Sequence, residues 1–204
     1  LGLIYVFWLT RPQCDPEMRF WKAVGDASLM FLYATLAMGP IARLLPSIGR
    51  VVLFRREVGI WFGLFASLHT FLILNGWVRW DIMLFLGYEV IPDLGRFVRL
   101  NSGFGLANIM GIVAILITLP LMGTSTDWAI QKLGGNAWKF LHSGSYIIFW
   151  LVVLHTAYFL FIQYAPHFHR PTPPLDWFRY PFLMLTMAVI GLQVAGFLLT
   201  VKRR

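Results

Sequence analysis

Residues 55–69 read Arg-Arg-Glu-Val-Gly-Ile-Trp-Phe-Gly-Leu-Phe-Ala-Ser-Leu-His, and residues 142–155 read His-Ser-Gly-Ser-Tyr-Ile-Ile-Phe-Trp-Leu-Val-Val-Leu-His. Each stretch has a nitrogen-bearing side chain at both ends of a largely apolar segment. A helix rises about 1.5 Å per residue, so these side chains would lie about 20 Å apart. An imidazole in hydrocarbon is costly unless something binds it. The stretches therefore predict facing membrane helices that hold iron porphyrin at up to two depths.

The composition places the chain in a membrane. Hydrophobic residues make up 58% and charged residues 13%, with a mean hydropathy of +0.69. A soluble domain carries about 25% charged residues. We predict an all-α integral membrane protein, a six-transmembrane-helix bundle that forms a single haem-binding domain over residues 1–204. The six expected spans are a truncated one ending near residue 10, then 24–44, 58–78, 103–122, 138–164 and 178–201.

The formal charge of +8 fits a membrane topology and does not indicate nucleic-acid binding. On one side of the membrane, the segments after the second and fourth spans and the C-terminal tail carry nine basic and two acidic residues. The segments on the other side carry eight basic and seven acidic residues. One opposite loop is long, and long loops count for less in the positive-inside rule. We therefore predict that Arg50, Lys132 and the C-terminus lie in the cytoplasm.

The sequence has no motif for a covalently held cofactor or for hydride chemistry. Cys14 is the single cysteine, so there is neither an internal disulfide nor a Cys-x-x-Cys-His haem attachment. There is no dinucleotide fingerprint, no phosphate loop and no soluble stretch long enough for a flavin or nicotinamide domain. Any haem must be held non-covalently, and electrons must come from a quinol or a separate reductase.

Four side chains are candidates for holding the cofactor. His69 lies eleven residues into the third span and His155 seventeen residues into the fifth. If odd-numbered spans run outward, these spans are parallel, so His69 and His155 share one depth. Arg55 and His142 then share a second depth at the cytoplasmic side. A histidine that merely hydrogen-bonds a neighbouring helix is the structural alternative.

Helical periodicity favours one of these spacings more than the other. At about 100° per residue, the step from Arg55 to His69 returns to within about 40° of the same face. The step from His142 to His155 falls about 140° off, so it requires a distorted turn near Gly144. The third span also carries a Gly-x-x-x-Gly at 59–63, which suits a close macrocycle or helix–helix packing. We see no internal repeat in the sequence.

Two external connections are expected. Residues 77–100 mix charges with aromatics, which suits a helix in the headgroup region or a partner-docking surface, with a well-packed loop as the alternative. Residues 163–177 contain four prolines and predict an irregular loop. His167 and His169 in this loop form a pair that could bind or reduce metal ions, although solvated side chains are the default expectation.

Several separate motifs resemble one known family. They are Phe-Leu-Tyr-Ala-Thr-Leu-Ala-Met-Gly-Pro-Ile-Ala-Arg at 31–43, Arg-Arg-x-x-Gly-x-Trp at 55–61 leading to His69, Thr-Ser-Thr at 124–126, Gln-Lys-Leu-Gly at 131–134, Trp138, Leu141, His142 and His155. In these motifs, and over residues 3–204, the chain resembles the MsrQ (YedZ) family of the ferric-reductase-like transmembrane group.

The resemblance implies a six-helix protein of the bacterial cytoplasmic (inner) membrane with one or two b-type haems. It implies that His69, His142 and His155 are candidate ligands of haem iron and that Arg55 serves the inner haem. It also implies quinone or FMN as the electron entry point. The acceptor would be a periplasmic molybdenum reductase subunit that repairs methionine sulfoxide in proteins.

We therefore expect a membrane b-type cytochrome that transfers electrons across the membrane and has no substrate-reducing domain of its own. The segments 77–100 and 163–177 depart from the family pattern. This departure motivates an alternative, an accessory or structural haem-binding subunit docked to other subunits of a larger respiratory or photosynthetic complex.

Overall fold

The computed structural model describes residues 1–12, 14–99, 102–163 and 175–202. Among these residues, five helical segments are long and apolar enough to cross a membrane. They coincide with the last five predicted spans. These segments are Pro16–Leu44, Pro46–Trp77, Phe104–Gly123, Gly135–Ile162 and Arg179–Lys202.

Two of these five segments are built from more than one helical element. Helix α2 (Pro16–Leu44) corresponds to the second of the six predicted spans, α5 (Phe104–Gly123) to the fourth and α9 (Arg179–Lys202) to the sixth. The third predicted span joins the 3-10 segment η1 (Pro46–Phe54), α3 (Arg55–Leu72) and the π-helical turn η2 (Ile73–Trp77). The fifth joins α7 (Gly135–His142), α8 (Ser145–Ala157) and the π-helical turn η4 (Tyr158–Ile162). The short helix α6 (Asp127–Leu133) precedes α7.

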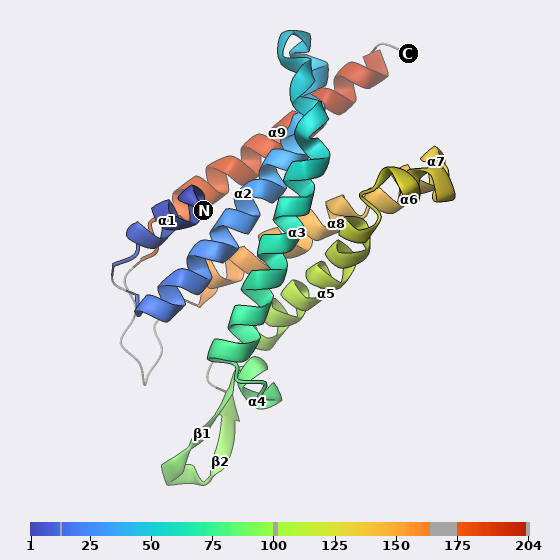
Figure 1. Ribbon diagram of the computed structural model, residues 1–204. Coiled ribbons are helices and arrows are strands. Elements are labelled where there is room, and N and C mark those ends of the chain that lie inside the picture. Colours follow the sequence, from blue (N-terminus) through green and yellow to red (C-terminus); the bar gives the residue numbers. More distant parts are fainter. Residues whose placement is uncertain (13, 100–101, 164–174, 203–204) are drawn as a thin grey trace.

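The predicted count of six spans is not confirmed. The N-terminal helix α1 (Gly2–Leu9) has eight residues, well short of the about 20 that cross a bilayer. It lies beside α2 and runs toward the end of the bundle where α2 begins (Figure 1). There Asp15 caps α2 by accepting a hydrogen bond from the Met18 amide.

The helices pack as two pairs with α9 on the outside of the first. Helix α2 packs against α3 and α9, α5 packs against α8, and α3 meets α5 between the pairs. Helices α3 and α8 run in the same direction (Figure 1), which confirms the parallel arrangement expected for these spans. Side chains at one depth on α3 and α8 can therefore face a common space.

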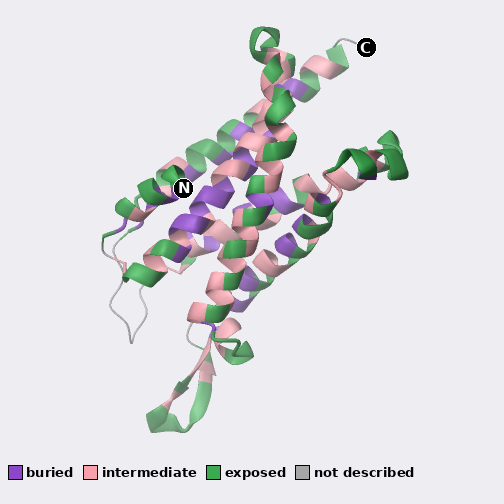
Figure 2. Cartoon of the chain, in the orientation of Figure 1, coloured by how far each residue is buried: buried purple, intermediate pink, exposed green. Residues whose placement is uncertain are grey.

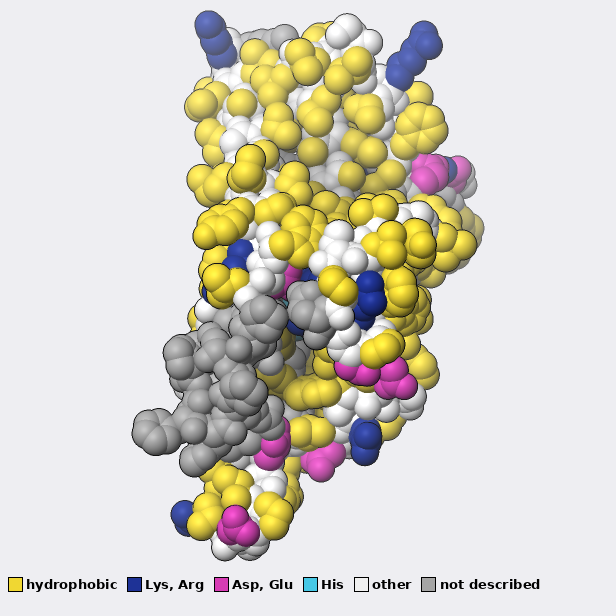
Figure 3. All heavy atoms as spheres, turned by 90° about the vertical axis from the view of Figure 1, so that its left-hand side faces the viewer, with side chains coloured by type: hydrophobic (Ala, Val, Ile, Leu, Met, Phe, Trp, Pro, Cys, Tyr) yellow, Lys and Arg dark blue, Asp and Glu magenta, His cyan; other side chains and the backbone are white. Residues whose placement is uncertain are grey.

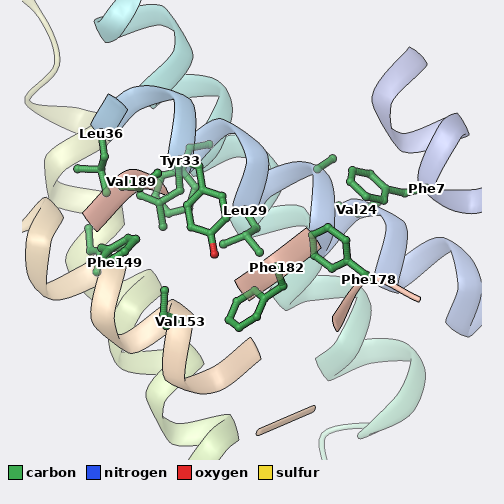
Figure 4. Close-up of a cluster of buried hydrophobic side chains, with 14 of the residues drawn as sticks. Phe7, Val24, Leu29, Tyr33, Leu36, Phe149, Val153, Phe178, Phe182 and Val189 are labelled. Atoms are coloured by element: carbon green, nitrogen blue, oxygen red, sulfur yellow. The ribbon is translucent and has the colours of Figure 1, made fainter. Parts of the chain in front are cut away.

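The apolar core lies where α2 meets α8 and α9. Leu29 and Tyr33 of α2 point toward Phe149 and Phe182, as Figure 4 shows. Burial follows the faces that the helices turn toward each other, and it is densest along α2 (Figure 2). Helix α2 thus supplies more of the core cluster than any other helix and packs against α1, α3 and α9.

The outer surface is that of a multi-pass membrane protein. Figure 3 shows hydrophobic side chains covering most of one side of the bundle, with basic residues at the upper end and mixed charges lower down. Large apolar side chains of α9 such as Met184, Met187 and Phe197 are more than half exposed. Such a surface suits lipid rather than water.

The connection over residues 77–100 is neither the predicted headgroup helix nor a loop, and its role as a partner-docking surface stays a prediction. It forms one helical turn, α4 (Ile82–Phe85), and an antiparallel hairpin of β1 (Tyr88–Ile91) and β2 (Arg96–Arg99). The turn between the strands is the 3-10 segment η3 (Pro92–Leu94) followed by Gly95, whose φ of 58° suits glycine. The predicted irregular loop falls mostly on residues 164–174, outside the described residues, as do His167 and His169.

Candidate functional site

A cavity of about 350 Å³ lies between the α2–α3 pair and the α5–α8 pair. His69 and His155 both line it. Much of the remaining lining is apolar, including Leu29, Phe62 and Val152. Two histidines on different spans therefore line one cavity between the two helix pairs.

His69 is held by one backbone carbonyl. Its Nδ1 lies 2.9 Å from the carbonyl oxygen of Trp21 on α2. A carbonyl oxygen can only accept a hydrogen bond, so Nδ1 carries the proton of the neutral ring. The lone pair is then on Nε2, which is the arrangement of a histidine prepared to bind a metal ion.

His155 is held in the same way from the other side. Its Nδ1 donates to the carbonyl oxygen of Ala107 on α5 at 2.7 Å. Its ring also meets the ring of Phe159 edge to face, with centroids 4.9 Å apart. The structure thus brings His69 and His155 to one cavity, each with an unprotonated Nε2 whose lone pair can bind a metal ion.

The donor set and the cavity fit a haem. Two neutral imidazoles with carbonyl-bound Nδ1 atoms are suitable axial ligands. Within the described residues, no three His, Cys, Asp or Glu side chains gather as a non-haem metal site would require.

Three charged side chains that the sequence did not predict as part of the site also line the cavity: Arg11, Asp26 and Asp176. Arg11 is 1% exposed and forms ion pairs with Asp26 and with Asp176, the latter at 2.9 Å. Burial acts to lower the pKa of the Arg11 guanidinium, but the two carboxylates outweigh it and raise that pKa above its ordinary value. This triad joins the segment after α1, helix α2 and the segment before α9.

Arg55 and His142, the second predicted pair, also lie near each other, but apart from this cavity. They are close enough for their charges to interact. Arg55 donates from Nε to the carbonyl oxygen of Thr35 at 3.1 Å. The His142 ring stacks on Trp138 with centroids 4.0 Å apart, and its Nε2 lies 3.2 Å from the Thr124 hydroxyl.

The structure bears on two expectations from the sequence: a distorted turn near Gly144 and the role of the glycines of α3. Helix α7 ends at His142 and α8 begins at Ser145, so the helix is interrupted where the spacing required a distortion. A Cβ on Gly63 would lie 2.8 Å from the sulfur of Met122, and one on Gly59 would lie 3.5 Å from Thr35. Gly63 therefore lets α3 pack closely on α5, one of the two predicted roles, whereas a side chain at Gly59 would make an ordinary contact.

Comparison with known proteins agrees with this geometry. Residues 23–153 match the family model "Ferric reductase like transmembrane component". The protein-methionine-sulfoxide reductase heme-binding subunit MsrQ of Herminiimonas arsenicoxydans is 32% identical over 157 residues, which are 76% of this chain and 65% of that protein. MsrQ of Salmonella paratyphi B is 30% identical over 158 residues, 76% of this chain and 72% of that protein.

A relative of a different description also matches. Magnetosome protein MamZ of Magnetospirillum gryphiswaldense is 31% identical over 134 residues, which are 66% of this chain and 18% of that protein. The chain thus spans about two thirds of the length of the MsrQ relatives and less than a fifth of MamZ. No solved structure matches the chain significantly.

Proposed function

Because the chain belongs to the ferric-reductase-like transmembrane family, and to the MsrQ group within it, we propose that it is a haem-binding electron-transfer subunit. The observation that carries the proposal is the meeting of His69 and His155 in one cavity, each with Nδ1 donating to a carbonyl. The haem would be b-type, since Cys14 is the single cysteine and no covalent attachment motif exists.

The residues of the cavity would prepare the site for a one-electron carrier. His69 and His155 would supply the two axial nitrogens, and the carbonyls of Trp21 and Ala107 would fix the tautomer and orientation of each ring. Haem iron with two imidazole ligands supplies reversible one-electron chemistry. Apolar side chains such as Leu29, Phe62 and Val152 form much of the lining, so fewer polar groups would reorganise when the charge changes.

We propose one haem, at the level of His69 and His155. His142 Nε2 already lies within hydrogen-bond distance of the Thr124 hydroxyl, and Arg55 donates to a backbone carbonyl. A second haem at this level would require His142 to give up that contact or to turn its ring away from Trp138. The two rings of the cavity require no such change.

The electron donor would be a quinol or a separate cytosolic reductase, and the chain would lie in the bacterial cytoplasmic membrane. The acceptor would be a periplasmic molybdenum reductase of methionine sulfoxide, docked at the end of the bundle that carries the hairpin. The names of the MsrQ relatives support this acceptor, since they describe the heme-binding subunit of a protein-methionine-sulfoxide reductase.

A pyridine haemochrome assay on the purified chain tests the proposal. We expect a b-type spectrum with one haem per chain, loss of most haem in the His69→Ala/His155→Ala double variant, and unchanged haem in His142→Ala. No b-type signal, or the same haem content in the double variant, would show that these histidines do not hold a haem. Two haems per chain, with one lost in His142→Ala, would instead establish the second level.

The match to MamZ favours a second candidate function, an accessory role in a larger assembly. There the family domain is a small part of a much longer protein. Copurification from native membranes distinguishes the two. Stable association with other membrane subunits, without reduction of a methionine sulfoxide reductase, would favour the accessory role.

A further inference from the structure

His69 and His155 are held by the same kinds of contact at the same sequence spacings. His69 donates a hydrogen bond to the carbonyl oxygen of Trp21, and His155 donates one to the carbonyl oxygen of Ala107. In each case the carbonyl lies 48 residues before the histidine in the sequence. Each histidine is also followed within four residues by a π-helical turn, η2 after His69 and η4 after His155. The sequence shows no repeat, so the correspondence lies in the geometry that the two helix pairs give to their histidines.

Each of the two histidine rings also lies against a glycine of the helix that supplies its carbonyl partner. Gly25 lies four residues after Trp21 and Gly111 lies four residues after Ala107, one helical turn along the same face. A Cβ on Gly25 would lie 2.9 Å from both Cε1 and Nδ1 of His69. A Cβ on Gly111 would lie 3.1 Å from the same two atoms of His155. Each imidazole therefore rests against a glycine at which an added Cβ would crowd the ring.

These contacts differ from those of glycines that serve helix packing. At Gly25 and Gly111, the nearest atoms that a Cβ would meet all belong to the imidazole. At Gly63 they belong to Met122 and Thr118, and at Gly196 they include the backbone of Pro40. The missing side chains at positions 25 and 111 thus make room for the rings rather than for a neighbouring helix.

We propose, resting on the function proposed above, that Gly25 and Gly111 are positioning residues for the two axial histidines. The carbonyl holds one edge of each ring, and the glycine lets the ring lie against the neighbouring helix. Together they fix the ring plane and the direction of Nε2. A methyl group at position 25 must displace the His69 ring, because a Cβ contact of 2.9 Å is too short. At position 111 the contact would be 3.1 Å, so the His155 ring must shift by a few tenths of an ångström or lengthen its hydrogen bond to the carbonyl.

The test compares Gly25→Ala and Gly111→Ala with Gly191→Ala in the full chain. Gly191 is the matched control, since it lies in α9 and a Cβ there meets nothing within 4 Å. We expect both site variants to bind haem with a shifted low-spin EPR signal and a shifted midpoint potential. We also expect about tenfold faster haem transfer to apomyoglobin, equivalent to about 1.4 kcal/mol. Gly191→Ala should match the unmodified chain in all three measurements.

If Gly25→Ala fails to fold, a second variant carries the test. In His69→Gly, free imidazole supplied in the buffer can take the place of the ring, and this untethered ligand can shift away from a new methyl group. In this background Gly25→Ala should fold, bind haem with the free imidazole and give the EPR signal of His69→Gly alone. A double variant that still fails to fold, or an EPR signal shifted from that of His69→Gly, would overturn the proposal.

The outcomes separate this inference from the function on which it rests. An unmodified chain without haem would overturn both. Haem in the unmodified chain, with Gly25→Ala and Gly111→Ala indistinguishable from Gly191→Ala, would overturn the positioning role alone.

Discussion

Replacing Arg11 by Met should destabilise the protein strongly. The guanidinium is 1% exposed and pairs with both Asp26 and Asp176, so its loss leaves two carboxylates buried beside each other without a counter-charge. Removing one partner of a buried ion pair costs about 3–5 kcal/mol. For a domain of this size about 1 kcal/mol lowers the melting temperature by about 2–4 °C, so we expect a fall of about 6–20 °C.

Thermal unfolding in a single detergent, followed by circular dichroism, measures this effect. Arg96→Met on the exposed face of the hairpin is the control, and it should change stability by less than about 0.5 kcal/mol. Adding Asp26→Asn and Asp176→Asn to Arg11→Met should recover part of the loss, since the unpaired charges are gone. A fall for Arg11→Met no larger than that of the control would refute the role assigned to the triad.

Three further substitutions test local interactions. Tyr33→Phe removes a 2.6 Å hydrogen bond to the Thr186 hydroxyl, so unfolding should become easier by about 1 kcal/mol while the haem spectrum stays unchanged. Asp15→Ala removes the cap of α2 and should cost about 1 kcal/mol, measured in the same melt, and an unchanged midpoint would argue against the cap. Arg56→Ala breaks an exposed pair with Asp127 and should cost less than about 1 kcal/mol, so a larger loss would contradict the expected solvent screening.

The sequence was sufficient to place the membrane-spanning helices because each is an apolar run of about 20 residues, a signal that needs no tertiary information. The hairpin of β1 and β2 was missed for the opposite reason. Its strands have four residues each, and the alternation around Pro92 and Gly95 is too short to distinguish from a charged loop. The first helix, α1, is apolar enough to suggest a span, and its eight described residues do not confirm one.

The placement of His69 near His155 was predictable from the position of each histidine along its span, since residues of two parallel spans can be ranked by depth in the membrane. The supporting contacts were not predictable, because every residue carries a carbonyl and only the packed helices select Trp21 and Ala107. Arg11 and Asp176 are 165 positions apart, and each taken alone indicates a solvated charge. Asp26 was the available signal, since a carboxylate within a span needs a partner.

The most direct test of the central claim is low-temperature EPR of the oxidised protein, combined with near-infrared magnetic circular dichroism. We predict a single low-spin species with two histidine ligands, lost in His69→Ala and in His155→Ala and retained in His142→Ala. The same bis-histidine spectrum in both His69→Ala and His155→Ala would contradict the account, since the iron would then be held elsewhere.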